Sequence, residues 1–211
     1  MSKHFLHRIK EEIRKGIPGE SSHLKMSPIN RISLKNKILL DANVKESAVA
    51  VILHINSENM MEFLLIQRST YDGKHSGQIA FPGGKRDFSD LSLEHTARRE
   101  AFEEVGIQLL ENNYIGELTE VYIPISNFSV LPIIYFHESL PKLTPNEREV
   151  AEIFSIKLSD LLNEESISTM RIKFSNGIIQ SNIPCFKLNQ QEVWGATALI
   201  LNELRDLILR I

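Results

Sequence analysis

The sequence predicts an α/β protein in which a mixed β-sheet lies between helices. Short apolar runs of strand length recur through the middle of the chain, and amphipathic stretches of helix length lie near its start, middle and end. Segments rich in glycine, proline or asparagine separate these stretches. Strands mixed with helices in this way are typical of a sheet covered by helices. The 211 residues, 42% of them hydrophobic, suffice for one sizeable domain with some elaboration.

The first expected element is an amphipathic helix near the amino terminus. Its apolar positions recur every four residues and a glycine marks its end: Phe5, Ile9, Ile13 and Gly16. We favour a helix docked on the main domain over a membrane or partner helix. Residues 20–45 are polar and predict an irregular segment that wraps the body. The chain is therefore divided into an N-terminal helix and wrapping segment, residues 1–44, and a main domain, residues 45–211.

Two strands and a helix are expected in the first half of the main domain. The strands cover residues 48–55 and 62–67, with a polar turn between them. A glycine-rich loop follows over residues 69–84, and a helix over residues 91–105. Gly106 is the natural end of this helix, since glycine accepts the left-handed backbone of a C-cap. Its N-cap candidates are Ser89, Asp90 and Ser92.

The second half adds strands, a hairpin and a closing helix. Strands are expected at residues 114–123, 130–137, 150–156 and 185–188. The helices are expected at residues 158–163 and 195–209. Between them, Asn176-Gly177 predicts a tight hairpin that joins residues 172–174 to residues 178–179.

Composition and charge exclude several classes of protein. A net charge of −3 gives no nucleic-acid-coating surface, and no apolar run has the length of a membrane span. The one cysteine, Cys185, cannot form an internal disulfide and is compatible with a reducing compartment. Residues 1–15 lack the apolar core of a signal peptide and carry acidic residues. We expect a cytoplasmic protein that binds neither nucleic acid nor membrane; a homodimer is one option for its assembly.

Three glutamates gather on one flank of the expected helix at residues 91–105. Glu100, Glu103 and Glu104 fall within an arc of roughly 100° on a helical wheel. Like charges this close raise one another's pKa unless a cation lies between them. A hard divalent cation with oxygen ligands removes that penalty. A solvated glutamate face is the alternative, and the spacing to the glycines upstream favours the metal.

This spacing resembles the Nudix box, a loop–helix–loop signature. The matching residues are Gly84 and then Arg99-Glu100-Ala101-Phe102-Glu103-Glu104-Val105-Gly106-Ile107. The gap from Gly84 to Arg99 is one residue longer than in the general box. Asp90, with Asp87 as the other option, stands where the box has a loop glutamate, and Asp90 is therefore a lesser ligand candidate. The resemblance implies a Nudix-type α/β/α sandwich with a mixed sheet.

Further motifs resemble the coenzyme A pyrophosphatase branch of this superfamily. They are Leu64-Leu65-Ile66-Gln67-Arg68-Ser69, His75-Ser76-Gly77-Gln78, Phe81-Pro82-Gly83-Gly84 and Trp194-Gly195-Ala196-Thr197-Ala198. Two positions depart, with Ile66 in place of threonine and Gly73 in place of arginine. The resemblance implies hydrolysis of coenzyme A or acyl-coenzyme A to 3',5'-ADP and 4'-phosphopantetheine or its acyl form, with Mg²⁺ or Mn²⁺. The alternatives are another nucleoside diphosphate derivative, such as ADP-ribose or NADH, and a non-catalytic nucleotide-binding regulator.

The resemblance and the local chemistry together assign the catalytic roles. The expected metal ligands are Glu100 and Glu104, with Glu103 as a third ligand or as the base. Arg99 is expected to orient Glu103, and a plain surface ion pair is the alternative. Outside the box, Glu149 is the first choice for the general base and Glu152 the second, although both could be solvated glutamates.

The expected substrate is a small nucleotide, and we expect the loop upstream of the box to contact it. The candidates are Arg68, Lys74, His75, Gly83, Gly84, Lys85 and Arg86. Arg68 could grip a phosphate in a bidentate manner, and the other basic residues could bind a 3'-phosphate. The glycines allow close backbone approach, a tight turn being the alternative. Trp194 and Tyr71 are candidates for stacking on adenine, with burial as the alternative for the tryptophan.

Overall fold

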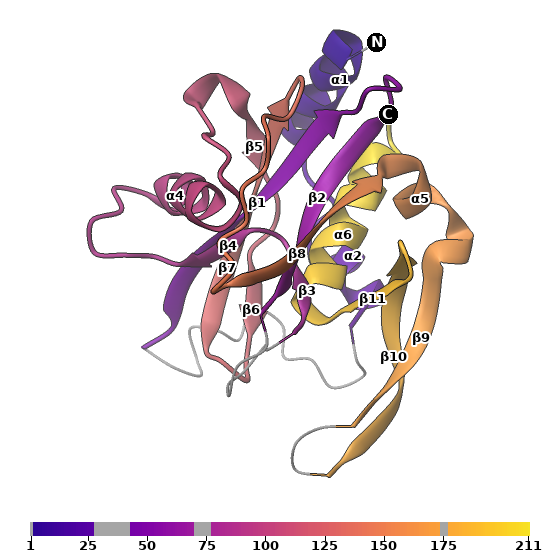
Figure 1. Cartoon of the computed structure of the whole chain (residues 1–211). Coiled ribbons are helices and arrows are strands. Elements are labelled where there is room, and N and C mark those ends of the chain that lie inside the picture. Colours follow the sequence, from indigo (N-terminus) through magenta and orange to yellow (C-terminus); the bar gives the residue numbers. More distant parts are fainter. Residues whose placement is uncertain (1, 28–42, 70–76, 174–176) are drawn as a thin grey trace.

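The computed structural model describes residues 2–27, 43–69, 77–173 and 177–211. A mixed sheet stands between two helical layers (Figure 1). One face carries α4 (Leu93–Val105), and the other carries α6 (Gly195–Ile208) together with α1 (Ser2–Lys15) and α2 (Glu20–Lys25). The predicted α/β/α sandwich is therefore confirmed. The division at residue 44 stays a prediction, although Ile9 and Met26 lie in the same core as α6.

Eight strands of the described residues form the main sheet. They are β1 (Lys45–Ile55), β2 (Met61–Arg68), β3 (Ile79–Ala80), β4 (Gly83–Lys85), β5 (Tyr114–Glu117), β6 (Val121–Ile123), β7 (Phe128–His137) and β8 (Val150–Lys157). The order is β3-β2-β1-β7-β5, with β8 paired to β2, β4 to β1 and β6 to β7. The pair β1–β7 is parallel and the other pairs are antiparallel. The site glycines on β4 thus lie against the central strand.

A second, three-stranded antiparallel sheet follows the short helix α5 (Leu158–Leu162). It consists of β9 (Ile167–Lys173), β10 (Ile179–Leu188) and β11 (Gln191–Trp194), and the β9–β10 hairpin extends from the body in Figure 1. The predicted hairpin is part of this longer pair, and its turn at residues 174–176 lies outside the described residues. The strand β11 was not predicted. Its turn, Asn189-Gln190, has two positive φ angles of 46° and 63°, but lacks the usual glycine.

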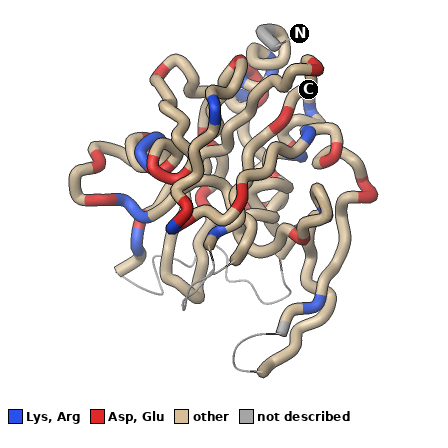
Figure 2. Tube along the Cα trace, viewed as in Figure 1, with Lys and Arg blue, Asp and Glu red and all other residues tan. Residues whose placement is uncertain are grey.

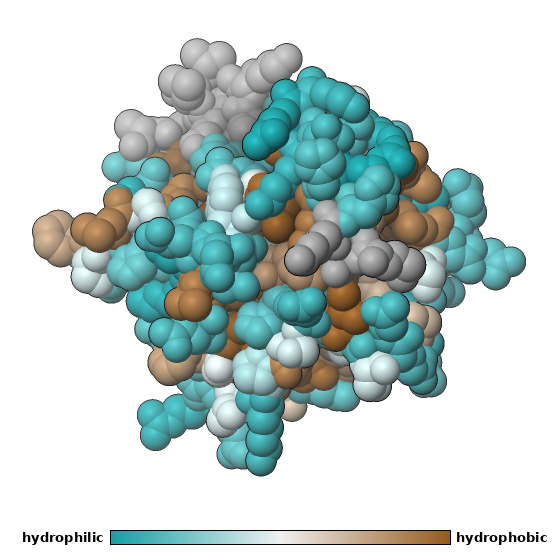
Figure 3. Space-filling view, turned by 90° about the horizontal axis from the view of Figure 1, so that it is seen from above, coloured by the Kyte–Doolittle hydropathy of each residue, from teal (hydrophilic) through white to brown (hydrophobic). Residues whose placement is uncertain are grey.

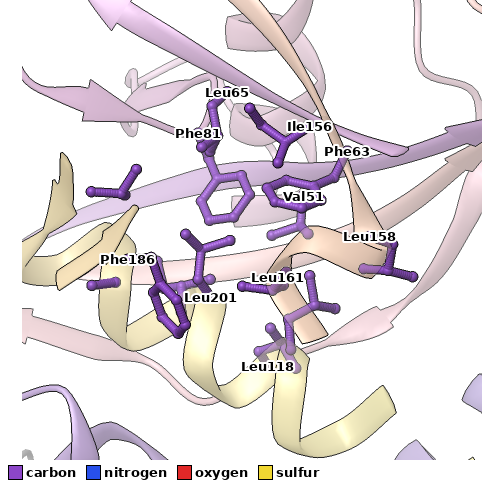
Figure 4. Packing of buried hydrophobic residues seen from close by; sticks show 14 of the residues in the cluster. Val51, Phe63, Leu65, Phe81, Leu118, Ile156, Leu158, Leu161, Phe186 and Leu201 are labelled. Carbon is purple, nitrogen blue, oxygen red and sulfur yellow. The ribbon is translucent and has the colours of Figure 1, made fainter. Parts of the chain in front are cut away.

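The core has one layer on each face of the sheet. Val51 and Leu53 of β1 point toward α6, whereas Ala50 and Ile52 point toward α4. Successive side chains of a strand face opposite sides, so a strand buried on both faces is a continuous apolar run. Figure 4 shows the layer under α6, where Val51, Phe63 and Leu201 meet. This packing holds β1 in place, and β4 and α4 pack against it.

Three predicted boundaries are wrong, each because of a contact distant in sequence. The segment expected to be irregular over residues 20–45 contains α2, because α6 binds its polar side chains; its residues 28–42 are not described. The expected strand at 114–123 is broken where Thr119 donates to the buried Glu203. The expected loop at 69–84 contains β3 and leads into β4, which pair with β2 and β1.

Figure 3 shows a face on which hydrophilic residues predominate and hydrophobic residues form separate patches. In the part of the chain that the structure describes, none of the helices combines the length and apolar character needed to span a membrane.

Candidate active site

Close backbone packing places Gly83 and Gly84 at the centre of the site. They pair with Val49 and Ala48 of β1. A Cβ atom at Gly83 would collide with the Ala48 carbonyl and the Val49 backbone, and one at Gly84 would collide with the carboxylate of Glu100. The strand pairing at position 83 therefore requires glycine, and glycine at position 84 lets the Glu100 carboxylate approach the strand.

The helix α4 has well-defined ends and one buried stripe. The side chain of Ser92 accepts a hydrogen bond of 3.1 Å from the backbone N–H of His95, and Gly106 adopts a left-handed φ of 75°. Of the three N-cap candidates, Ser92 is thus the cap. Ala97, Ala101 and Val105 are fully buried against the sheet. This packing turns Glu100 and Glu104 toward β4.

Glu104 is held at the bottom of the site. Its carboxylate accepts hydrogen bonds from the Gly83 backbone N–H at 2.8 Å and from Arg68 Nη1 at 3.2 Å. The residue is 1% exposed. Burial raises the pKa of Glu104 to about 7, although the Gly83 N–H and Arg68 oppose this. A buried carboxylate that is costly to ionise is suited to a cation ligand.

Glu100 lies one turn earlier and faces Gly84. Its Oε1 accepts a hydrogen bond of 2.8 Å from Arg99 Nη1. Burial raises the pKa of Glu100, Arg99 lowers it, and the charges of Glu103 and Glu149 raise it further. Two raised carboxyl pKa values at one end of the sheet mark a place where positive charge would be stabilising.

Arg99 connects the helix to the loop before it. Its guanidinium donates to both oxygens of Asp90 at 3.0 Å, to the Lys85 carbonyl at 3.1 Å, and to Glu100 and Glu103 at 2.8 and 3.0 Å. The hydrogen bonds from Arg99 hold the pKa of Asp90 far below its usual range. Figure 2 shows basic and acidic residues interleaved on α4 and this loop.

Asp90 is a structural anchor, and its candidacy as a metal ligand is not retained. Its side chain is fully buried, and it accepts further hydrogen bonds of 2.9 Å from the Asp87 N–H and the Thr96 hydroxyl. These contacts, with those from Arg99, engage both oxygens. The role of Arg99 is also wider than the predicted orientation of Glu103, because the same guanidinium positions Glu100.

The three base candidates are exposed. The side chain of Glu103 is 48% exposed and pairs with Arg99. Glu149 is exposed, and its backbone carbonyl accepts a hydrogen bond of 2.8 Å from Ser69 N–H. The charge of Glu149 contributes to the raised pKa of both Glu100 and Glu104. Glu152 lies further along β8, opposite Gln67, and is exposed.

The predicted substrate contacts are partly brought together. Arg68 points at Glu104, and Lys85 is exposed on β4. Arg86 instead pairs with Glu46 at 2.8 Å and donates to the Asp90 carbonyl, so it supports the loop. The half-buried Trp194 ends β11 and lines a pocket with residues 77–79. Three other candidates lie outside the described residues: Tyr71, Lys74 and His75.

The carboxylates of Glu100 and Glu104 fit a divalent cation whose remaining ligands come from water and the substrate. Within residues 2–27, 43–69, 77–173 and 177–211, no three acidic, histidine or cysteine side chains form a ready-made metal cage. Glu100 and Glu104 nevertheless approach β4 together, and Arg99 and Arg68 occupy their oxygens. Mg²⁺ is commonly held by one or two carboxylates, waters and substrate phosphates. Two carboxylates therefore suffice as the protein's share.

A family model for the NUDIX domain matches residues 44–174. The human mitochondrial coenzyme A diphosphatase NUDT8 is 32% identical over 160 residues, covering 74% of this chain and 67% of that protein. The NudL protein of Pectobacterium atrosepticum, named an uncharacterized Nudix hydrolase, is 33% identical over 160 residues, covering 76% and 82%. The NudL protein of Yersinia enterocolitica is 35% identical over 163 residues, covering 77% and 81%.

Solved structures show the same fold. A MutT/nudix family protein from Enterococcus faecalis superposes with a TM-score of 0.58 at 16% identity, covering 85% of this chain and 70% of that one. The MutT protein of Methanosarcina mazei gives a TM-score of 0.50 at 21% identity, covering 77% and 92%. The chain belongs to the Nudix family. It is a pyrophosphatase of a family whose hydrolases generally need divalent metal ions.

Proposed function

We propose that the enzyme hydrolyses the pyrophosphate bond of coenzyme A or acyl-coenzyme A. The products are 3',5'-ADP and 4'-phosphopantetheine or its acyl form. The observation that carries this proposal is the joint approach of Glu100 and Glu104 to Gly83-Gly84, at the end of the motifs that resemble the coenzyme A branch. The name of the human relative, a coenzyme A diphosphatase, supports the same substrate.

Glu100 and Glu104 would hold Mg²⁺ or Mn²⁺, and Glu103 is a third candidate. When bound, the ion neutralises phosphoryl oxygens and lowers the pKa of the attacking water. Arg99 keeps Glu100 and Glu103 in place through its bonds to Asp90 and Lys85. Arg68 can then leave Glu104 and bind a substrate phosphate. A guanidinium can donate two parallel hydrogen bonds to such a phosphate.

Glu149 is our choice for the general base. Its carboxylate takes a proton from water as the water oxygen bonds to phosphorus, and the bond from that phosphorus to the bridging oxygen breaks. The leaving phosphate departs as an oxyanion. Glu149 suits this role because it is exposed yet acts electrostatically on both ligand candidates. We place the reaction in the cytoplasm; a homodimer stays a prediction.

A product screen by mass spectrometry tests the proposal. Coenzyme A, acetyl-coenzyme A, ADP-ribose, NADH and diadenosine polyphosphates are each incubated with Mg²⁺ or Mn²⁺. We expect 3',5'-ADP from the coenzyme A substrates at the highest kcat/KM. A higher kcat/KM for ADP-ribose or NADH would identify that compound, in place of coenzyme A, as the substrate. Nucleotide binding with no hydrolysis of any substrate would favour the regulator instead.

A further inference from the structure

An open pocket of about 730 Å³ lies between β3 and the second sheet, where Figure 1 shows β3 beside β11. Gln78 and Ile79 line one side of it, and residues of β9, β10 and β11 line the other. The volume lies within the range of small-molecule sites, which is roughly 300–1,000 Å³. None of the catalytic candidates described above lines this pocket.

The strand register shows which side chains of the second sheet share one face. Residues directly opposite each other on neighbouring strands point to the same face. Trp194 lies opposite Cys185, which lies opposite Ser168, and Met170 and Ile172 follow Ser168 at alternate positions of β9. The opposite face of this sheet packs into the core under α6. The half-buried side chains of Trp194, Met170 and Ile172 therefore line the pocket from one face.

This face of the second sheet carries no net charge. Lys187 lies opposite Glu192, so the two opposite charges are cross-strand neighbours. Arg171 points to the other face, because successive residues of a strand alternate. The remaining described residues that line the pocket are uncharged. The pocket is consequently a poor site for a phosphate, which needs a cation that is not already balanced.

The pocket suits a neutral ligand that is partly apolar. Ile79, Met170 and Trp194 offer apolar surface, and the side chains of Gln78 and Gln190 offer amides. Small-molecule sites commonly combine a mostly apolar lining with a few polar groups. Of the two halves of the proposed substrate, the pantetheine arm has the matching chemistry, because it is an uncharged chain of apolar carbons and amides. The adenosine half carries charged phosphates.

The strand β3 connects this pocket to the candidate active site. The backbone N–H of Arg68 donates to the Gln78 carbonyl at 3.0 Å, and the Arg68 side chain reaches Glu104 at 3.2 Å on the α4 side of the sheet. Ile79 instead packs on the α6 side. The carboxylates and the pocket thus lie on opposite sides of the β3 edge. A long, flexible arm can pass around such an edge, whereas a compact nucleoside cannot.

We propose that this pocket binds the pantetheine arm of the substrate. The apolar carbons of the arm lie against Trp194 and Met170, and its amides lie beside Gln78 and Gln190. The assignment rests on the proposed function and names the residues that select the substrate. A dinucleotide without such an arm leaves the pocket empty and loses these contacts.

Fluorescence tests which half of the substrate occupies the pocket. Trp194 is the single tryptophan of the chain, so its emission reports on this pocket. Coenzyme A, 4'-phosphopantetheine and 3',5'-ADP are titrated separately in EDTA, which prevents metal-dependent hydrolysis. We expect the two ligands with an arm to change the emission and 3',5'-ADP to leave it unchanged. A change caused by 3',5'-ADP, or no change with either ligand that has an arm, would overturn the proposal.

Two neighbouring residues of β9 give a matched pair of variants. Met170 faces the pocket, whereas the exposed Thr169 points to the opposite face. Met170→Asp puts a charge against the apolar part of the arm, and should raise the KM for coenzyme A and weaken the emission change by about tenfold or more. Thr169→Asp should alter neither. Thermal melts check that both proteins fold, and Met170→Ala serves if Met170→Asp does not. A folded Met170 variant with the wild-type KM and emission change would contradict the assignment.

The outcomes separate the pocket from the proposed function. If coenzyme A is not hydrolysed but the emission results hold, the proposed function fails and the pocket stands. If coenzyme A is hydrolysed while no ligand with an arm affects Trp194, the pocket fails and the function stands.

Discussion

The backbone N–H of Gly83 donates a hydrogen bond of 2.8 Å to the carboxylate of Glu104. This bond ties the end of the substrate loop to the last turn of α4. Gly83 is itself fixed by its pairing with Val49, so the donor belongs to the sheet and does not rotate as a side chain would. The position of Glu104 is thus set before any substrate binds, which lowers the cost of assembling the site.

The first prediction concerns the metal ligands. Glu100→Gln and Glu104→Gln should each lower kcat by about 100-fold or more, because a ligand charge is lost while the volume is kept. In Glu104→Gln the new amide keeps an oxygen that can accept the hydrogen bond from Gly83, so the fold should persist. Steady-state kinetics at saturating Mg²⁺ and thermal melts by circular dichroism check both points.

Glu111→Gln is the matched control, because Glu111 is exposed on the short 3₁₀ helix at residues 111–113. It should keep wild-type kcat. Near wild-type turnover of both ligand variants would remove Glu100 and Glu104 from the metal site.

The second prediction separates activity from stability through two glycines. Gly84→Ala should lower kcat by about tenfold or more with little change in Tm, since the atoms nearest to the new Cβ belong to the carboxylate end of Glu100, which can move away. Gly116→Ala should do the opposite, because its Cβ would press on Ile13 of α1. It should lower Tm by a few degrees, as about 1 kcal/mol of overpacking would, and leave kcat unchanged.

Kinetics and melts of both variants give a crossed comparison. The position of Glu100 would be wrong if Gly84→Ala kept full kcat in a folded protein.

The sequence predicted what depends on local chemistry. A helix over residues 91–105 with a glycine end and a glutamate flank was predicted from spacing and capping alone, and the structure has it over residues 93–105. The pairing of Asp90 with Arg99 could not be predicted in this way, because it requires the loop before the helix to fold back onto Arg99. The helix α2 was missed for a similar reason: Ser22 and His23 look like loop residues until α6 supplies their hydrogen-bond partners.

The third prediction concerns the Arg99–Asp90 pair. Arg99→Ala leaves a buried carboxylate without its cation, and should destabilise the fold by about 3 kcal/mol and lower kcat. Asp90→Asn should mainly destabilise, because Arg99 keeps its bonds to Glu100 and Glu103. The double variant should cost less than the sum of the single changes, by about 1 kcal/mol or more. Urea unfolding of the four proteins measures this coupling, and strictly additive losses would contradict it.

The last prediction concerns pH and the docking of α2. Burial alone would raise the pKa of Glu203, but hydrogen bonds from His23, Thr119 and Gly19 outweigh it and leave the pKa below its usual value. A carboxyl with a lowered folded pKa contributes stability above its unfolded pKa, about 4.3, and loses it as the pH falls through the folded value.

Glu203→Gln should therefore destabilise the protein by about 2 kcal/mol at neutral pH, the size of a hydrogen bond to a charged group. This difference in unfolding free energy should shrink as the pH falls below about 4, because protonation of Glu203 then removes its stabilising contribution from the wild type. Urea unfolding at about pH 7 and about pH 3.5 measures both values, with the exposed Glu192→Gln as the control that shows no such change. A loss that stays constant across this range would mean that the ionised carboxylate of Glu203 does not hold α2 in place.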